Sequence, residues 1–105
     1  MSRYNPSLDE ETESITHDVV TEPPMFRVLL HNDDFTTMDF VVQIVMGVFN
    51  KTFEEAAQIM LNVHRKGIGL CGVYTYEVAE TKVDTVHSLA RQHQYPLKCT
   101  MEKDD

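Results

Sequence analysis

The sequence predicts an α+β fold: a single β-α-α-β-α-β domain with three helices packed on a small three-stranded sheet. Apolar residues over 25–103 alternate between strand-like runs and helical periods in that order. The length of 105 residues, with 42% hydrophobic content, suits one domain with one modest core. Residues 1–22 are acidic and have no sustained apolar period. We therefore expect a flexible acidic arm, 1–22, followed by one domain, 23–105.

The first half of the domain reads as one strand and two helices. Residues 25–31 (MFRVLLH) are rich in β-formers and lie between prolines and an Asn-Asp turn, which predicts a strand. An apolar stripe over 38–50 predicts a helix, with Thr36 or Thr37 as its N-cap. Thr52 and Glu55 have the spacing of a capping box, which predicts a second helix.

The second helix should end at Gly67, a residue typical of helix C-termini. We expect its apolar stripe to be formed by Phe53, Ala56, Ala57, Met60, Leu61 and His64. After it, the sequence predicts a strand over 70–76 (LCGVYTY), a helix over 77–94 and a strand over 96–103 that begins at a proline.

The net charge of −8 is concentrated near the two ends of the chain. Residues 25–101 contain eight acids and seven bases and are nearly neutral. Nucleic-acid binding and binding to an anionic membrane both need a basic face, so we expect neither partner. The chain starts without an apolar signal region, and no apolar run approaches the roughly 18 residues of a membrane span. Cys71 and Cys99 are isolated, so we expect free buried thiols and a cytoplasmic location.

The segment His31-Asn32-Asp33-Asp34 joins the first strand to the first helix. One interpretation is a turn, because Asn and Asp bond their own backbone and acids favour a nearby helix N-terminus. The other is a cation-binding corner, because several side-chain acceptors converge there. His64 has two interpretations as well: a histidine at the edge of the core, or a polar group beside an apolar pocket. The methionines Met38, Met60 and Met101 suit either a core or an adaptable pocket.

Signatures of enzymes are absent from the sequence: there is no G-x-S-x-G, P-loop or H-E-x-x-H motif. Asp33, Asp34 and His64 could form an acid/base set or a metal site. Mg²⁺ and Ca²⁺ sites normally recruit more oxygen ligands than these. We therefore expect a protein that is not an enzyme and has no cofactor or metal.

Four blocks of the sequence together resemble the ClpS family of bacterial adaptors, which deliver N-degron substrates to the Clp AAA+ protease. The blocks are NDDFTTMDFVV, AAQIMLNVHRKG, CGVYTYEVAETKV and HQYPLKCTMEK, and the resemblance extends from about Met25 to Lys103. It implies the β-α-α-β-α-β fold that the periodicity predicts independently. The family often has proline at the position of Thr37.

The resemblance implies a site for the first residue of a substrate that begins with Leu, Phe, Tyr or Trp. Asn32, Asp33 and His64 match the residues that contact the α-amino group, and Asp34 borders that site. Met38 matches a gatekeeper against β-branched first residues. The residues matching the wall of the apolar pocket are Thr36, Met38, Val41, Met60, Val63 and Leu97.

The resemblance also implies docking on the N-terminal domain of a ClpA-type AAA+ unfoldase, with Glu77 and Lys82 as contact residues and the arm needed for delivery. Two alternatives remain at this point. One is a non-catalytic interaction module of related fold that binds no N-degron. The other is a metal-dependent or acid/base enzyme that uses Asp33, Asp34 and His64.

Overall fold

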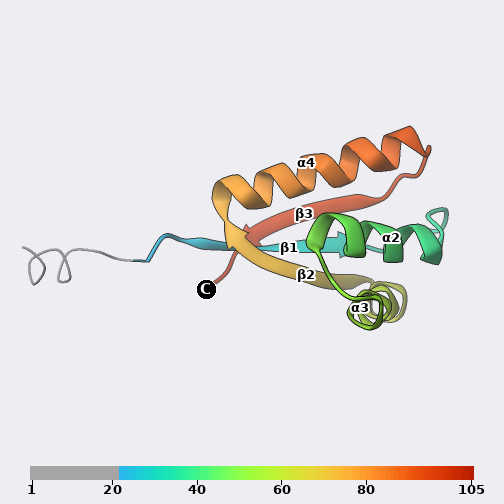
Figure 1. Ribbon diagram of the computed structural model, residues 1–105, viewed down its shortest axis with the longest axis horizontal. Coiled ribbons are helices and arrows are strands. Elements are labelled where there is room, and N and C mark those ends of the chain that lie inside the picture. Colours follow the sequence, from blue (N-terminus) through green and yellow to red (C-terminus); the bar gives the residue numbers. More distant parts are fainter. Residues whose placement is uncertain (1–21) are drawn as a thin grey trace, which may run out of the picture.

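The structure, a computed structural model, describes residues 22–105. The predicted arm, 1–22, therefore lies almost wholly outside the described residues. The predicted order of elements is confirmed (Figure 1). The elements are β1 (Met25–His31), α2 (Met38–Phe49), α3 (Phe53–Lys66), β2 (Ile68–Thr75), α4 (Tyr76–Gln92) and β3 (Lys98–Lys103).

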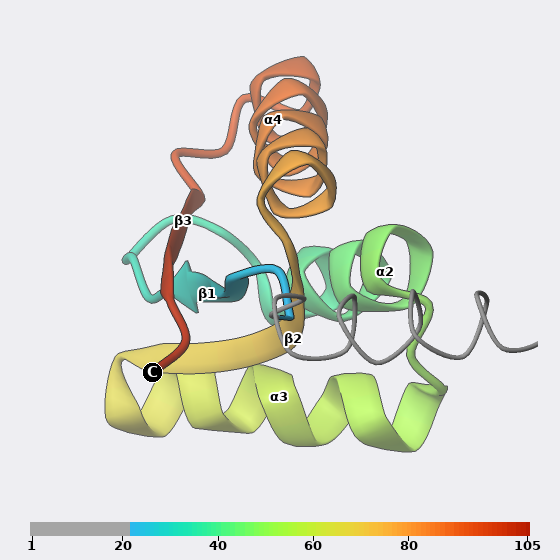
Figure 2. The same cartoon turned by 90° about the vertical axis from the view of Figure 1, so that its left-hand side faces the viewer.

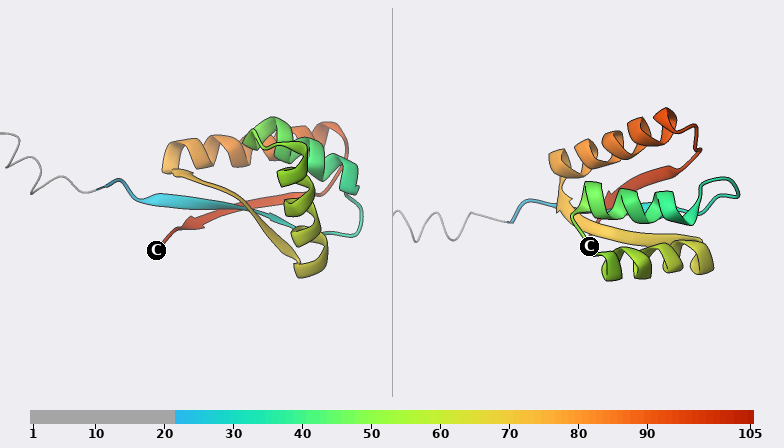
Figure 3. Two further views of the ribbon diagram at one scale, coloured as in Figure 1. Left: turned by 60° about the horizontal axis from the view of Figure 1, so that its bottom comes forward. Right: turned by 45° about the vertical axis from the view of Figure 1, so that its right-hand side comes forward.

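The three strands form one antiparallel sheet in the order β2-β1-β3. His31 at the end of β1 is opposite Ile68 of β2, and Met25 at its start is opposite Thr75. The sheet therefore has two distinct ends. The end of β1, the β1–α2 loop and the end of α3 meet at one end, and α4 begins at the other (Figures 1 and 3).

The core lies between the sheet and the helices. Figure 2 shows α2 and α4 on the same side of the strands, and α3 packs against β2. Val28 and Leu30 of the central strand have no exposed surface, as expected for residues with a strand on either side. Cys71 and Cys99 are free and buried, which confirms that prediction. Burial raises the pKa of each thiol to about 12.

The helix ends follow their predicted chemistry. Thr37, rather than Thr36, caps α2, and its hydroxyl accepts a hydrogen bond from the Phe40 N–H at 3.1 Å. Thr52 and Glu55 form the predicted capping box. Gly67 ends α3 with φ of 86°, a left-handed conformation that glycine adopts without steric cost.

The predicted apolar stripe of α3 is only partly correct. Ala56, which belongs to the predicted stripe, is buried and Met60 packs against the core, but Phe53 is 61% exposed and His64 is exposed. Val63, which the predicted stripe left out, is buried. Ala56 and Val63 are seven residues apart, which is two helical turns, so they share one face. The face that packs on β2 is therefore rotated by about one position from the prediction. No helix within residues 22–105 combines the length and apolar character that a membrane crossing requires.

Candidate functional site

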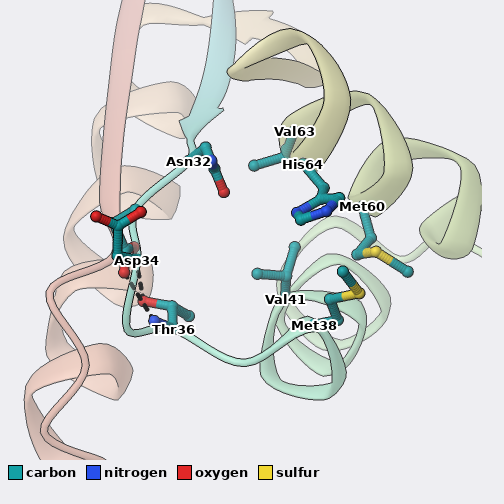
Figure 4. Close-up of a pocket in the computed structure, with 9 residues that line it drawn as sticks. Asn32, Asp34, Thr36, Met38, Val41, Met60, Val63 and His64 are labelled. Atoms are coloured by element: carbon teal, nitrogen blue, oxygen red, sulfur yellow. Dashed lines mark hydrogen bonds between the residues drawn. The ribbon is translucent and has the colours of Figure 1, made fainter.

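A pocket of about 240 Å³ opens at the end of the sheet where β1 finishes (Figure 4). One wall is the β1–α2 loop, the opposite wall is the last part of α3, and the start of α2 closes the space between them. The lining residues are Asn32, Asp33, Asp34, Thr36, Met38, Val41, Met60, Val63 and His64. The volume lies below the roughly 300–1,000 Å³ of pockets for drug-sized ligands, so it suits a single side chain and its backbone.

The structure brings together nine of the ten residues that the sequence assigned to substrate binding. The tenth, Leu97, does not line the pocket. It is 4% exposed and belongs to the core cluster. It lies directly before β3, within a core cluster that also contains Val86 and Cys99.

Asp33 folds the loop that forms the polar wall. Its Oδ1 accepts the backbone N–H groups of Phe35 and Thr36 at 2.8 and 2.7 Å, and its Oδ2 accepts the Thr36 hydroxyl at 2.7 Å. The turn interpretation of this segment is therefore correct for Asp33. A carboxylate offers about four lone-pair positions, so one position on Oδ2 remains for another donor.

The same contacts set the charge of Asp33. Partial burial raises the pKa of this carboxyl, but the hydrogen bonds from the Thr36 hydroxyl and from two backbone N–H groups outweigh it. The pKa consequently lies below its ordinary value. Asp33 is therefore a carboxylate at neutral pH, and it holds a negative charge on the pocket wall.

Asn32 connects the two walls of the pocket. Its backbone N–H donates to the carbonyl oxygen of Gly67 at 3.0 Å, which fixes the end of β1 to the end of α3. Its side chain points into the pocket, and the His64 ring points inward from the opposite wall (Figure 4). His64 is exposed, so the interpretation as a polar group beside a pocket describes it better than the interpretation as a core histidine.

The rest of the lining is apolar. Val41 and Val63 are 5% and 2% exposed, and they form the buried part of the wall. Met38 is 44% exposed at the start of α2 and lines the same pocket as Met60 (Figure 4). The pocket thus offers hydrogen-bond acceptors on one side and a hydrophobic slot on the other. Among residues 22–105, no group of three or more His, Cys, Asp or Glu side chains is arranged to hold a metal ion.

The two predicted docking residues lie on α4, away from the pocket. Glu77 is exposed in the first turn of that helix. Lys82 is partly buried, and its Nζ donates to the carbonyl oxygen of Val48 at 2.7 Å. The ammonium also lies 5.8 Å from the Phe49 ring centroid and 5.2 Å from that of Tyr74. Lys82 therefore ties α4 to the end of α2, a structural role that the sequence did not predict.

The fold and the pocket define a small α+β binding domain whose site joins acceptors to an apolar slot. Residues 21–100 match a family model described as ATP-dependent Clp protease adaptor protein ClpS. The chain is 58% identical over 104 residues to the ClpS adapter of Desulforapulum autotrophicum, covering 99% of this chain and all of that one. It is 60% identical over 98 residues to the ClpS adapter of Nitratidesulfovibrio vulgaris, covering 93% and 98%. The chain belongs to the ClpS family of Clp protease adaptors.

A solved structure agrees with this assignment. The structure of Agrobacterium tumefaciens ClpS2 bound to L-phenylalaninamide matches with a TM-score of 0.76 and 30% sequence identity. The match covers 79% of this chain and all of that one. The β-α-α-β-α-β fold predicted from the sequence is therefore shown both by the coordinates and by a relative.

Proposed function

We propose that this Clp protease adaptor binds N-degron substrates by their free α-amino group and their bulky apolar first side chain. The observation that carries the proposal is the pocket itself, with acceptors on the loop wall and an apolar slot between α2 and α3. The relative from A. tumefaciens was solved with L-phenylalaninamide, a molecule that joins a free amino group to an apolar side chain. That ligand chemistry is the one that this pocket complements.

The polar wall suits an ammonium group. An α-amino group has a reference pKa near 8, so it is mostly charged at neutral pH and has three donors. Asn32, Asp33 and His64 each offer an acceptor: an amide oxygen, the remaining lone pair of Oδ2 and an imidazole nitrogen. Each charge-assisted bond contributes about 1.5–3 kcal/mol. Asp34 borders this wall and adds negative potential beside it.

The apolar slot suits the first side chain. Burying Leu or Phe there contributes roughly 1.5–3 kcal/mol, and the small pocket limits binding to one residue. Met38 stands half-exposed at the rim and would meet a branched Cβ, so Val and Ile should be excluded while Leu, Phe, Tyr and Trp enter. An internal peptide residue has no ammonium and would leave Asp33 desolvated without a partner.

Delivery needs a second surface. We assign it to the start of α4, with Glu77 exposed there, and the expected partner is the N-terminal domain of a ClpA-type AAA+ unfoldase. Lys82 has two N–H donors beyond the one used for Val48, so it can serve the fold and a partner together. The arm, 1–22, is proposed to act in delivery and not in peptide binding.

Comparing a free peptide with its acetylated form tests the ammonium site. We expect fluorescence anisotropy to show binding of a labelled Leu- or Phe-initiated peptide, because its ammonium meets three acceptors. N-acetylation removes the charge and two donors, and we expect the affinity to fall at least about 100-fold, the equivalent of roughly 2.7 kcal/mol. A peptide beginning with Ser is the control for the apolar slot. Equal affinity for the free and acetylated peptides would refute the proposed mechanism.

A further inference from the structure

Gly69 is the second residue of β2 and is buried against α3. A Cβ atom at this position would lie 2.6 Å from Cγ2 of Val63 and 3.0 Å from the carbonyl oxygen of Ile59. It would also lie 3.4 Å from Cγ2 of Ile59. Gly67 is the described glycine with positive φ, and Gly69 has none. Backbone freedom therefore does not explain this glycine, whereas the close approach of α3 does.

The contact at Gly69 reaches the pocket through one side chain. Val63 is the nearest neighbour of a Cβ atom built at position 69, and it also lines the pocket, where Figure 4 shows it. Valine in a helix keeps one χ1 rotamer in about 90% of cases, so its methyl groups do not rotate away easily. The Ile59 carbonyl oxygen belongs to the helix backbone, so it moves only if α3 moves. A side chain at position 69 would therefore have to displace the side chain of Val63.

We propose that Gly69 is a positioning residue that sets the width of the pocket through Val63. The inference rests on the proposed function, since it concerns the first residues that the pocket accepts. A side chain at position 69 pushes the Val63 methyl groups away from β2 and toward the pocket. In a pocket of about 240 Å³, that displacement excludes the largest first residues before the smaller ones. Gly69 thus keeps Trp and Phe within the accepted range.

The substitution Gly69→Ala tests this role. Affinities for Leu-, Phe- and Trp-initiated peptides are measured by anisotropy, and thermal unfolding confirms that the variant is folded. We expect Trp and Phe peptides to lose at least about threefold more affinity than the Leu peptide. The matched control is Gly47→Ala on α2, where an added Cβ meets nothing within 4 Å. That variant should keep the wild-type ratio between the peptides.

A double variant separates positioning from a general loss of structure. Val63→Ala removes the methyl group that a Cβ at position 69 would meet, so Gly69→Ala combined with Val63→Ala should give the ratio of Val63→Ala alone. If Gly69→Ala alone does not fold, the double variant must restore both folding and that ratio. An unchanged ratio in folded Gly69→Ala, or a double variant that restores neither, overturns the inference. Failure of the wild type to bind any free peptide would instead overturn the proposed function.

Discussion

Asp33 has two roles in the proposed site, because one carboxylate both folds the β1–α2 loop and presents a charge to the pocket. Three of its acceptor positions hold Phe35 and Thr36, and one remains. The sequence suggested these roles as alternatives, a turn or a cation-binding corner. The structure shows that the turn is what places the acceptors, so the first interpretation supports the second.

A substitution at Met38 is the most direct way to change which first residues the pocket accepts. Met38→Ala should admit Ile- or Val-initiated peptides, because it removes the side chain at the rim that a branched Cβ would meet. We expect their affinities to rise roughly tenfold, in line with the 1–3 kcal/mol that a methylene or methyl contact controls in a hydrophobic pocket. Competition anisotropy against a Leu-initiated probe measures the change.

Met46→Ala provides the matched control for Met38→Ala. Met46 lies on the same helix with 38% exposure, but it does not line the pocket. Its truncation should leave the preference among first residues unchanged. An unaltered preference in Met38→Ala itself would refute the gatekeeper role.

At the scale of elements, the sequence predicted the type and order of the helices and strands within residues 22–105, because each has strong periodicity or clear end signals. It predicted the buried face of α3 only in part. Apolar residues occupy neighbouring positions such as Met60 and Leu61, so the pattern allows more than one buried face. The strand over 70–76 actually begins at Ile68, directly after the Gly67 stop, because β1 extends far enough to pair with it.

The pocket residues were predicted from the family resemblance, and Leu97 is the one among them that does not line the pocket. A residue's place in a motif does not tell whether its side chain reaches a pocket surface or stops in the core below it. That distinction depends on how β3 enters the sheet. Neither the Val48 contact of Lys82 nor the close approach at Gly69 has a local sequence signal, because both join elements distant in the chain.

The contact between α4 and α2 gives a prediction at the element scale. Lys82→Met keeps an unbranched side chain of nearly the same length but removes its hydrogen bond to Val48 and its charge above two rings. We expect a loss of about 1–2 kcal/mol in the free energy of unfolding, measured by urea denaturation. Peptide affinity should change little, because α4 does not line the pocket.

Lys103→Met is the control for Lys82→Met. It removes the same charge from an exposed position at the end of β3. Exposed substitutions usually change stability by less than about 0.5 kcal/mol. Equal effects of the two variants would mean that the tie between α4 and α2 adds nothing to stability.

At the scale of the whole molecule, the two proposed surfaces lie at opposite ends of the sheet. The pocket lies beside His31 and Ile68, whereas α4 begins after Thr75, opposite Met25. A substrate held in the pocket therefore leaves the start of α4 free for the protease. This separation predicts that binding and delivery can be impaired independently.

Deleting residues 1–20 tests that independence. Peptide binding should be unchanged, because every pocket residue lies between 32 and 64. Degradation of a Leu-initiated reporter by the protease should fall, because the arm is proposed to act in delivery. A chain in which the same residues are scrambled controls for length and charge. If deletion abolishes peptide binding, the arm belongs to the binding domain.

The hydrogen bonds of Asp33 affect how any mutational map of this pocket should be understood. Replacing Asp33 by alanine removes the hydrogen bonds to the Phe35 and Thr36 amides as well as the proposed ligand contact. The measured loss of peptide affinity would therefore combine the effect of a disrupted turn with the effect of a lost contact. Asparagine keeps one carbonyl oxygen for the turn but lacks the charge, and glutamate extends the carboxylate beyond the turn geometry. The position should therefore tolerate fewer substitutions than its partial exposure suggests, and conservative replacements there will not behave conservatively.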